Sequence, residues 1–255
     1  MVNVHSIILT SFLSIAVGGI LGSFFNMLIY RLPKQKSILF PRSFCPNCKH
    51  NLSWKNLIPI VSFCFQKGSC SFCGSLISKR YIVVECLQVF LTFWYLFPNS
   101  FVYLNHQFFV FCSICIILFF TDLEHFMLPF YVNLSLIPLG LFFAIKHSTV
   151  SSVLISTLIL IGVLFLFRAL FNYLYKRDTF GIGDIILLGG FCINWGWILS
   201  VMSFYFAAIL GGLYSIYLLV TKRKKRLDYI PFGPFLILGF YASYFFHEYV
   251  ISMLF

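Results

Sequence analysis

The sequence has 255 residues, of which 60% are hydrophobic and 20% aromatic, and its mean hydropathy is +0.95. These values exclude a soluble globular domain and predict an all-α polytopic membrane protein. The net charge of +11 suggests a nucleic-acid partner at first, but the basic residues gather in a few segments between apolar runs. That distribution is typical of a membrane protein and argues against nucleic acid.

Apolar runs predict about eight transmembrane helices in chain order. They cover residues 6–29, 82–97, 107–121, 131–146, 150–174, 184–199, 201–220 and 233–254. The first run has no basic n-region and no small-residue cleavage site, so we expect a retained helix rather than a signal peptide. Arg31, Lys34 and Lys36 follow this helix, which places its C-terminal end in the cytosol.

The other basic residues support this topology. Sixteen of the eighteen Lys and Arg residues lie in residues 31–80, 175–183 and 221–230, which the eight helices all place on the cytosolic side. We therefore expect a polytopic membrane protein with both termini outside. The basic run at 222–226 is expected to serve as an orientation signal that also contacts anionic membrane lipid.

Residues 31–80 form the only sizeable segment outside the predicted helices. CPNC (Cys45, Cys48) and CSFC (Cys70, Cys73) are separated by 21 residues, and two such pairs resemble a zinc ribbon with four thiolate ligands. Disulfides are the alternative, but the reducing cytosol disfavours them. A loop of this size builds little core, so structural Zn²⁺ would stabilise it. Cys64 lies between the pairs and is expected to be a buried apolar thiol.

Glu85 lies just inside the second predicted helix, where a charged residue is expected to pair or to line a cavity. One interpretation is a structural ion pair with Arg80 or Arg31, and the other is a role in a binding site of the N-terminal part. Asn26 in the first helix is a candidate for a hydrogen bond between helices.

Asp122 and Asp184 each lie where an apolar run meets the predicted cytosolic surface. Two predicted helices separate them, so both reach the same face, where they could form an acid/base pair that activates water for peptide hydrolysis. Helix caps or a proton relay are the alternatives. Gly181 and Gly183 would let the backbone approach a substrate strand and adopt tight turns. Glu124, next to His125, is interpreted as a surface feature.

The motifs together resemble the prepilin peptidases, or type IV leader peptidases, which are bifunctional membrane aspartic proteases of the GxGD type. The resemblance covers essentially the whole chain. The motifs, in the order found in that family, are GSFFNMLIYRLP (22–33), CPNC and CSFC, SKRYIVVE (78–85), TDLEHFMLP (121–129), GIGD (181–184) and PFGPFL (231–236).

The resemblance implies cleavage of prepilins or pseudopilins, which carry a short basic leader and a hydrophobic helix, after a Gly at the cytosolic face. It also implies N-methylation of the new N-terminal residue with S-adenosylmethionine. Asp122 and Asp184 match the catalytic aspartates. The expected organisation is a first helix (1–30), a methylation-associated Cys₄ loop (31–80) that Glu85 adjoins, and a peptidase domain (81–255).

Two positions depart from the family pattern. Phe130 stands where the family usually has an acidic residue, and Ile186 where it commonly has Lys. Both aspartates remain in place. Two other classes compete with the peptidase: a transporter or channel with Asp122, Asp184 and Glu85 in a proton path, and a non-catalytic scaffold whose zinc loop binds a cytosolic partner. The position of the aspartates at one face argues against the transporter, and a scaffold has no need for GIGD.

Overall fold

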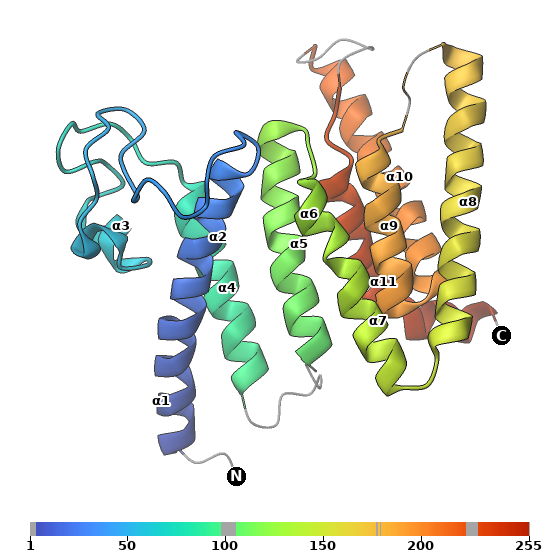
Figure 1. Cartoon of the computed structure of the whole chain (residues 1–255), viewed down its shortest axis with the longest axis horizontal. Coiled ribbons are helices and arrows are strands. Elements are labelled where there is room, and N and C mark those ends of the chain that lie inside the picture. The colour runs from blue at the N-terminus through green and yellow to red at the C-terminus, as the bar shows by residue number, and fades with distance from the viewer. Residues whose placement is uncertain (1–3, 98–105, 177, 179, 223–228, 255) are drawn as a thin grey trace. The chain divides into compact units, whose positions relative to one another are not determined.

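The structure is a computed structural model, and it describes residues 4–97, 106–176, 178, 180–222 and 229–254 (Figure 1). These residues are mostly helical and contain no β-strand, only two isolated bridges, which confirms the predicted all-α class. Most of the basic run at 222–226 lies outside the described residues. The chain divides into two compact units, Met1–Ile117 and Leu118–Phe255, with the boundary inside helix α5 (His106–His125).

Unit 1 is built on a long helical hairpin. Its first arm joins α1 (Val4–Leu13), a π-helical turn η1 (Ser14–Gly18) and α2 (Gly19–Arg31), and its second arm is α4 (Arg80–Leu96). The arms pack so closely that a Cβ on Gly22 would lie 2.7 Å from the Cα of Glu85. Small residues permit this approach of two backbones in membrane proteins.

One turn beyond Gly22, the side-chain amide of Asn26 donates a hydrogen bond of 2.9 Å to the carbonyl of Tyr81. The predicted hydrogen bond between helices is therefore confirmed. Moving four residues forward on α2, from Gly22 to Asn26, moves the contact four residues back on α4, from Glu85 to Tyr81. The helices α2 and α4 therefore run antiparallel.

The segment between α2 and α4 contains little regular structure. It holds a 3₁₀ turn, η2 (Trp54–Leu57), and one short helix, α3 (Val61–Phe65). Its start is fixed to the end of α2, because the guanidinium of Arg31 donates hydrogen bonds to the carbonyls of Ser37, Ile38 and Pro41. Five donors in a planar fork suit Arg to collecting several carbonyls of one loop.

In its described residues, unit 2 contains the C-terminal end of α5 and six further helices. They are α6 (Phe130–Leu134), α7 (Leu136–Lys146), α8 (Val150–Tyr175), α9 (Ile182–Trp195), α10 (Trp197–Val220) and α11 (Gly233–Leu254). The α6–α7 segment runs away from the end of α5 and α8 runs back, so α9 starts near the level where α5 ends (Figure 1). Fully buried Phe191 and Phe240 belong to the core between α9 and α11.

The predicted count of eight spans is not confirmed. Among the described residues, four helices are long and apolar enough to cross a membrane: Ile7–Arg31, His106–His125, Val150–Tyr175 and Trp197–Val220. Two apolar helices are shorter than the roughly 20 residues that a spanning helix needs: Phe130–Lys146 and Ile182–Trp195. Helix α4 has 17 residues, and its buried positions include Glu85, Gln88 and Thr92.

Candidate active site

Asp122 lies in the last turn of α5 with only 5% of its surface exposed. Its Oδ2 accepts a hydrogen bond of 2.9 Å from the backbone N–H of Gly233, the first residue of α11. A Cβ on Gly233 would lie 2.7 Å from the same oxygen, so no larger residue fits there without displacing the carboxylate. Gly233 belongs to the PFGPFL motif, but sequence analysis assigned it no role.

Asp184 lies in the first turn of α9 and is half-buried. This agrees with the predicted place of Asp184 at a helix start. The carboxylates of Asp122 and Asp184 are close enough to interact electrostatically. The structure therefore brings together the two residues that the sequence proposed as an acid/base pair.

Leu128 packs against two glycines that neighbour the aspartates: Gly183, next to Asp184, and Gly233, which is bonded to Asp122. Positive φ at Phe126 turns the chain at the end of α5, and Leu128 follows in this turn. The Leu128 side chain lies 3.3 Å from the Cβ position of Gly183 and 3.2 Å from that of Gly233. Three sequence motifs, TDLEHFMLP, GIGD and PFGPFL, thus meet at one leucine.

The glycines of GIGD leave room for neighbouring side chains, and their backbone conformations do not require glycine. Gly181 has φ −69° and ψ 138°, which any residue can adopt, and φ is not positive at Gly183. The expectation that both glycines form turns forbidden to other residues is therefore wrong. A Cβ on Gly181 would lie 2.9 Å from Oδ2 of Asp184, and one on Gly183 would press on Leu128.

Asn133 was missed by the sequence analysis. It is 1% exposed on α6, and its amide donates a hydrogen bond of 2.8 Å to the carbonyl of Gly183. A lone Asn four residues after Pro129 gives no local signal of this contact. The bond fixes the first turn of α9, and with it the backbone that carries Asp184.

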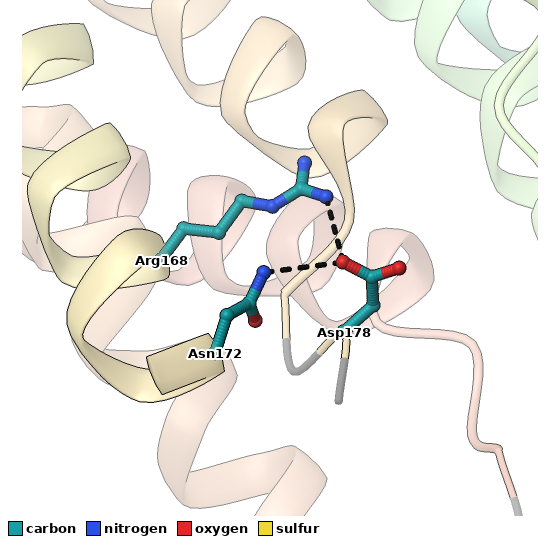
Figure 2. A network of polar contacts seen from close by, with 3 residues as sticks. All are labelled: Arg168, Asn172 and Asp178. Carbon is teal, nitrogen blue, oxygen red and sulfur yellow. Dashed lines mark hydrogen bonds and ion pairs between the residues drawn. The ribbon is translucent and has the colours of Figure 1, made fainter. Parts of the chain in front are cut away.

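A polar network lies on the segment that leads into GIGD. Arg168 and Asn172 on α8 both donate to Oδ1 of Asp178, over 3.0 and 3.1 Å (Figure 2). The Asp178 side chain is 75% exposed, so this ion pair lies at the surface. The network ties the segment before Gly181 to the end of α8.

Glu124 and His125 lie next to the buried Asp122, but their side chains are 35% and 26% exposed and their charged atoms are 4.0 Å apart. This partial exposure agrees with the interpretation of a surface feature. Phe130 begins α6 and is 55% exposed, whereas Ile186 on α9 is half-buried.

The four predicted metal ligands meet in unit 1. The Sγ atoms of Cys45, Cys48, Cys70 and Cys73 all lie within 4.8 Å of one another, and those of Cys45 and Cys73 are 3.9 Å apart. Four thiolates at about 2.3 Å from a tetrahedral Zn²⁺ would be separated by about 3.8 Å. The cluster therefore fits zinc with little adjustment.

The two CxxC motifs have the same local structure. In each, the first Cys donates its N–H to a carbonyl five residues later, and its own carbonyl accepts an N–H from the residue four positions later. That later residue has positive φ in both cases, 59° at Lys49 and 69° at Gly74. The sequence analysis missed this internal correspondence because only the two cysteines are shared.

Glu85 is 7% exposed and its Oε2 accepts a hydrogen bond of 2.6 Å from the backbone N–H of Ile60. Glu85 belongs to unit 1, whereas both aspartates belong to unit 2. Cys64 is exposed, so the expectation of a buried thiol is wrong. Cys64 lies on the short helix α3, which contains no buried residue.

Comparisons with known proteins match both units. Residues 16–98 match the Bacterial Peptidase A24 N-terminal domain, and residues 109–216 match the Type IV leader peptidase family. No solved structure matches the chain.

Three of the relatives are each described as "Prepilin leader peptidase/N-methyltransferase". The protein of Dichelobacter nodosus is 33% identical over 88% of this chain and 87% of its own length. That of Bacillus subtilis (strain 168) is 31% identical over 92% and 94%. The Legionella pneumophila protein is 30% identical over 94% and 91%.

Proposed function

The chain belongs to the type IV leader peptidase family, and from this premise we propose that it removes the leader from prepilins with Asp122 and Asp184 as its catalytic pair. It is a membrane enzyme, as the apolar helices and the family indicate. The observation that carries the assignment is the meeting of three motifs around Leu128. Asp122 lies in one motif, accepts a hydrogen bond from the second and interacts electrostatically with Asp184 in the third.

The proposed chemistry divides two roles between the carboxylates. Asp184 takes a proton from water, whose oxygen attacks the carbonyl carbon of the scissile peptide bond. Asp122 gives its proton to the leaving nitrogen as the C–N bond breaks. The start of α9 favours the ionised form of Asp184, because a helix N-terminus carries partial positive charge. Two carboxylates at close range cannot both be ionised, so one proton is shared by the pair.

The hydrogen bond from Gly233 indicates which carboxylate oxygen of Asp122 would carry the proposed proton. Oδ2 already accepts the Gly233 N–H, so Oδ1 is the oxygen that carries the proton and donates it. Glycine at position 233 also leaves room for the carboxylate, which a Cβ there would displace.

We propose that zinc at Cys45, Cys48, Cys70 and Cys73 is structural. Four thiolates leave no open coordination position for water, which separates such sites from catalytic zinc. Hydrogen bonds from the Ser75 hydroxyl and the Ser75 backbone N–H lower the pKa of Cys73 to about 6. A lower pKa favours the thiolate form, which is the form that binds metal.

The second activity of the family is N-methylation, and S-adenosylmethionine would supply the methyl group to the new terminal amine. We place this activity with the Cys₄ loop (31–80), following the first helix (1–30), and the peptidase with residues 81–255. Glu85 is a supporting residue of the methylation part, because its carboxylate is buried beside the loop and the aspartyl chemistry does not use it.

The proposed substrates are prepilins or pseudopilins with a basic leader and a hydrophobic helix. The proposed topology has both termini outside and the aspartates at the cytosolic face of the bacterial inner membrane. This topology is supported by the concentration of Lys and Arg in residues 31–80, 175–183 and 221–230, which the predicted helices place on the cytosolic side.

Mass spectrometry of a co-expressed type IV prepilin tests the function. Cleavage appears as loss of the leader, and methylation as a gain of about 14 Da on the new N-terminus. A Cys70→Ser variant separates the two parts: cleaved but unmethylated pilin supports separate sites. Uncleaved pilin would instead mean that the loop holds the leader. An intact prepilin in the presence of well-inserted wild-type protein would favour a transporter or scaffold.

A further inference from the structure

The segment between Trp54 and Lys67 reaches far along the first helix of unit 1. A Cβ on Gly19 would lie 2.9 Å from the Cβ of Pro59, so Pro59 packs directly against the α2 backbone. Gly19 precedes Arg31 by twelve residues, which is about 18 Å along an α-helix. Arg31 itself is bonded to the carbonyls at the start of the loop. The chain therefore descends from the end of α2 to a point well inside the predicted span.

The second helix of unit 1 gives an independent measure of this depth. Ile60 donates its backbone N–H to Glu85, and Glu85 lies five residues after Arg80, or about 8 Å along α4. One leaflet of the hydrocarbon core is about 15 Å thick. Measured from Arg80, residue 60 lies within one leaflet, and measured from Arg31, residue 59 lies near the middle of the bilayer.

The composition of this segment suits a lipid environment. Residues 56–66 contain no charged side chain, and Lys55 and Lys67 flank them. Phe65 is 84% exposed, and the other exposed apolar side chains of the segment are Leu57, Ile58 and Val61. Trp54 is 69% exposed beside Lys55, in the pairing of aromatic and basic residues that is common at a membrane surface.

Several backbone groups of the segment have partners within the protein. Pro59 has no N–H, and the N–H groups of Val61, Ser62 and Cys64 donate to carbonyls within the segment. Ile60 has φ 62°, an uncommon conformation for a β-branched residue, and its N–H is bonded to the Glu85 carboxylate. Irregular backbone is tolerated at membrane depth where it is buried against protein, and here Pro59 packs on Gly19 of α2 while Ile60 is bonded to Glu85 of α4.

We propose that residues 57–65 form a re-entrant segment that inserts into the bilayer and fastens the zinc-binding loop to lipid. Pro59 packs on Gly19, Glu85 binds the Ile60 N–H from inside unit 1, and Phe65 with Val61 faces acyl chains. Lys55 and Lys67 remain at the headgroups, where their charges meet lipid phosphates. The loop is thus held at the membrane at both ends and in its middle.

Photo-crosslinking from Phe65 tests the insertion. Phe65 is replaced by p-benzoylphenylalanine, the full-length protein is placed in phosphatidylglycerol-containing nanodiscs and irradiated, and intact-protein mass spectrometry counts phospholipid adducts. Phe40 receives the same replacement as a matched control, because it is 75% exposed but precedes Pro41, whose carbonyl is bound by Arg31 at the end of α2. The proposal expects a several-fold higher lipid adduct yield from position 65 than from position 40.

Equal yields at the two positions overturn the proposal. A crosslink from position 65 to another part of the chain, or to a copurified protein, also overturns it, because protein would then cover this face. A second pair of variants tests the anchor in the Phe65-labelled protein. Glu85→Gln keeps an acceptor for the Ile60 N–H and should keep the lipid adduct, whereas Glu85→Leu should lower it. An unchanged adduct in Glu85→Leu removes Glu85 from the proposal.

Discussion

The backbone N–H of Gly233 donates a hydrogen bond of 2.9 Å to Oδ2 of Asp122, across 111 residues of sequence. It joins the start of α11 to the end of α5 and orients a carboxylate that is almost fully buried. Neither residue can change without affecting the other, because a Cβ at position 233 would overlap the carboxylate. The PFGPFL motif thus contacts Asp122 directly.

Replacing either Asp122 or Asp184 with Asn should lower prepilin cleavage by at least about 10²–10⁴-fold, because one carboxylate cannot both activate water and protonate the leaving nitrogen. Leader loss measured by mass spectrometry, at equal membrane levels of enzyme, checks this. Glu124→Gln is the control, since Glu124 is the neighbouring, partly exposed carboxylate. Near-normal cleavage by either Asn variant would remove the aspartyl mechanism.

Gly233→Ala should lower cleavage by roughly 10²-fold while the protein still inserts, because a displacement of about 1 Å at a reacting group has this effect. The new methyl group would push Oδ2 of Asp122 from its position. Gly212→Ala is the matched control, because a Cβ there meets nothing within 4 Å. If both variants cleave at the wild-type rate, Gly233 does not position Asp122.

Purified protein should contain about one zinc per chain, held by the four thiolates of the tetrahedral site. A Cys45→Ser/Cys48→Ser double variant should lose the metal, whereas Cys64→Ser should keep it, since Cys64 is not among the four clustered thiols. Elemental analysis by mass spectrometry gives the metal content of each variant. Stoichiometric zinc in the double variant would exclude this site.

Lys49→Gly should slow the loss of zinc to a chelator, because a residue with a side chain costs about 1 kcal/mol in the left-handed conformation that Lys49 adopts. Gly74→Ala should accelerate zinc loss for the same reason at the equivalent position of the second motif. The two substitutions are expected to change the rate of zinc loss in opposite directions, so each serves as the control for the other. If zinc is lost to the chelator at the same rate in wild type and in both variants, the conformations of residues 49 and 74 do not limit metal release.

Asp178→Ala should change prepilin cleavage by no more than a few-fold and the stability by less than about 1 kcal/mol, since exposed ion pairs contribute little. The Asp178 side chain is 75% exposed although it receives two hydrogen bonds (Figure 2). Thermal unfolding in detergent and the cleavage assay measure the two effects. A loss as large as that of Asp184→Asn would show that this network positions GIGD.

Several features were predictable from sequence because they depend on local pattern. Apolar runs predicted the helices, and doubled CxxC motifs predicted the thiol cluster that the structure contains. The count of eight spans is not confirmed, and hydropathy does not reveal where a helix breaks: Ser135 divides the run 130–146 into α6 and α7. Polar side chains buried in α4, such as Gln88, also weaken its apolar character.

The sequence by itself determined the membrane class, the motifs of the family and the two aspartates, because each depends on residue type and spacing along the chain. Only the tertiary structure decided which groups meet these residues. Gly233 reaches Asp122, Asn133 holds Gly183, and Glu85 binds Ile60 across 111, 50 and 25 residues. In each of these hydrogen bonds one partner is a backbone group, which its residue type does not reveal, so only the packing of helices selects the pair.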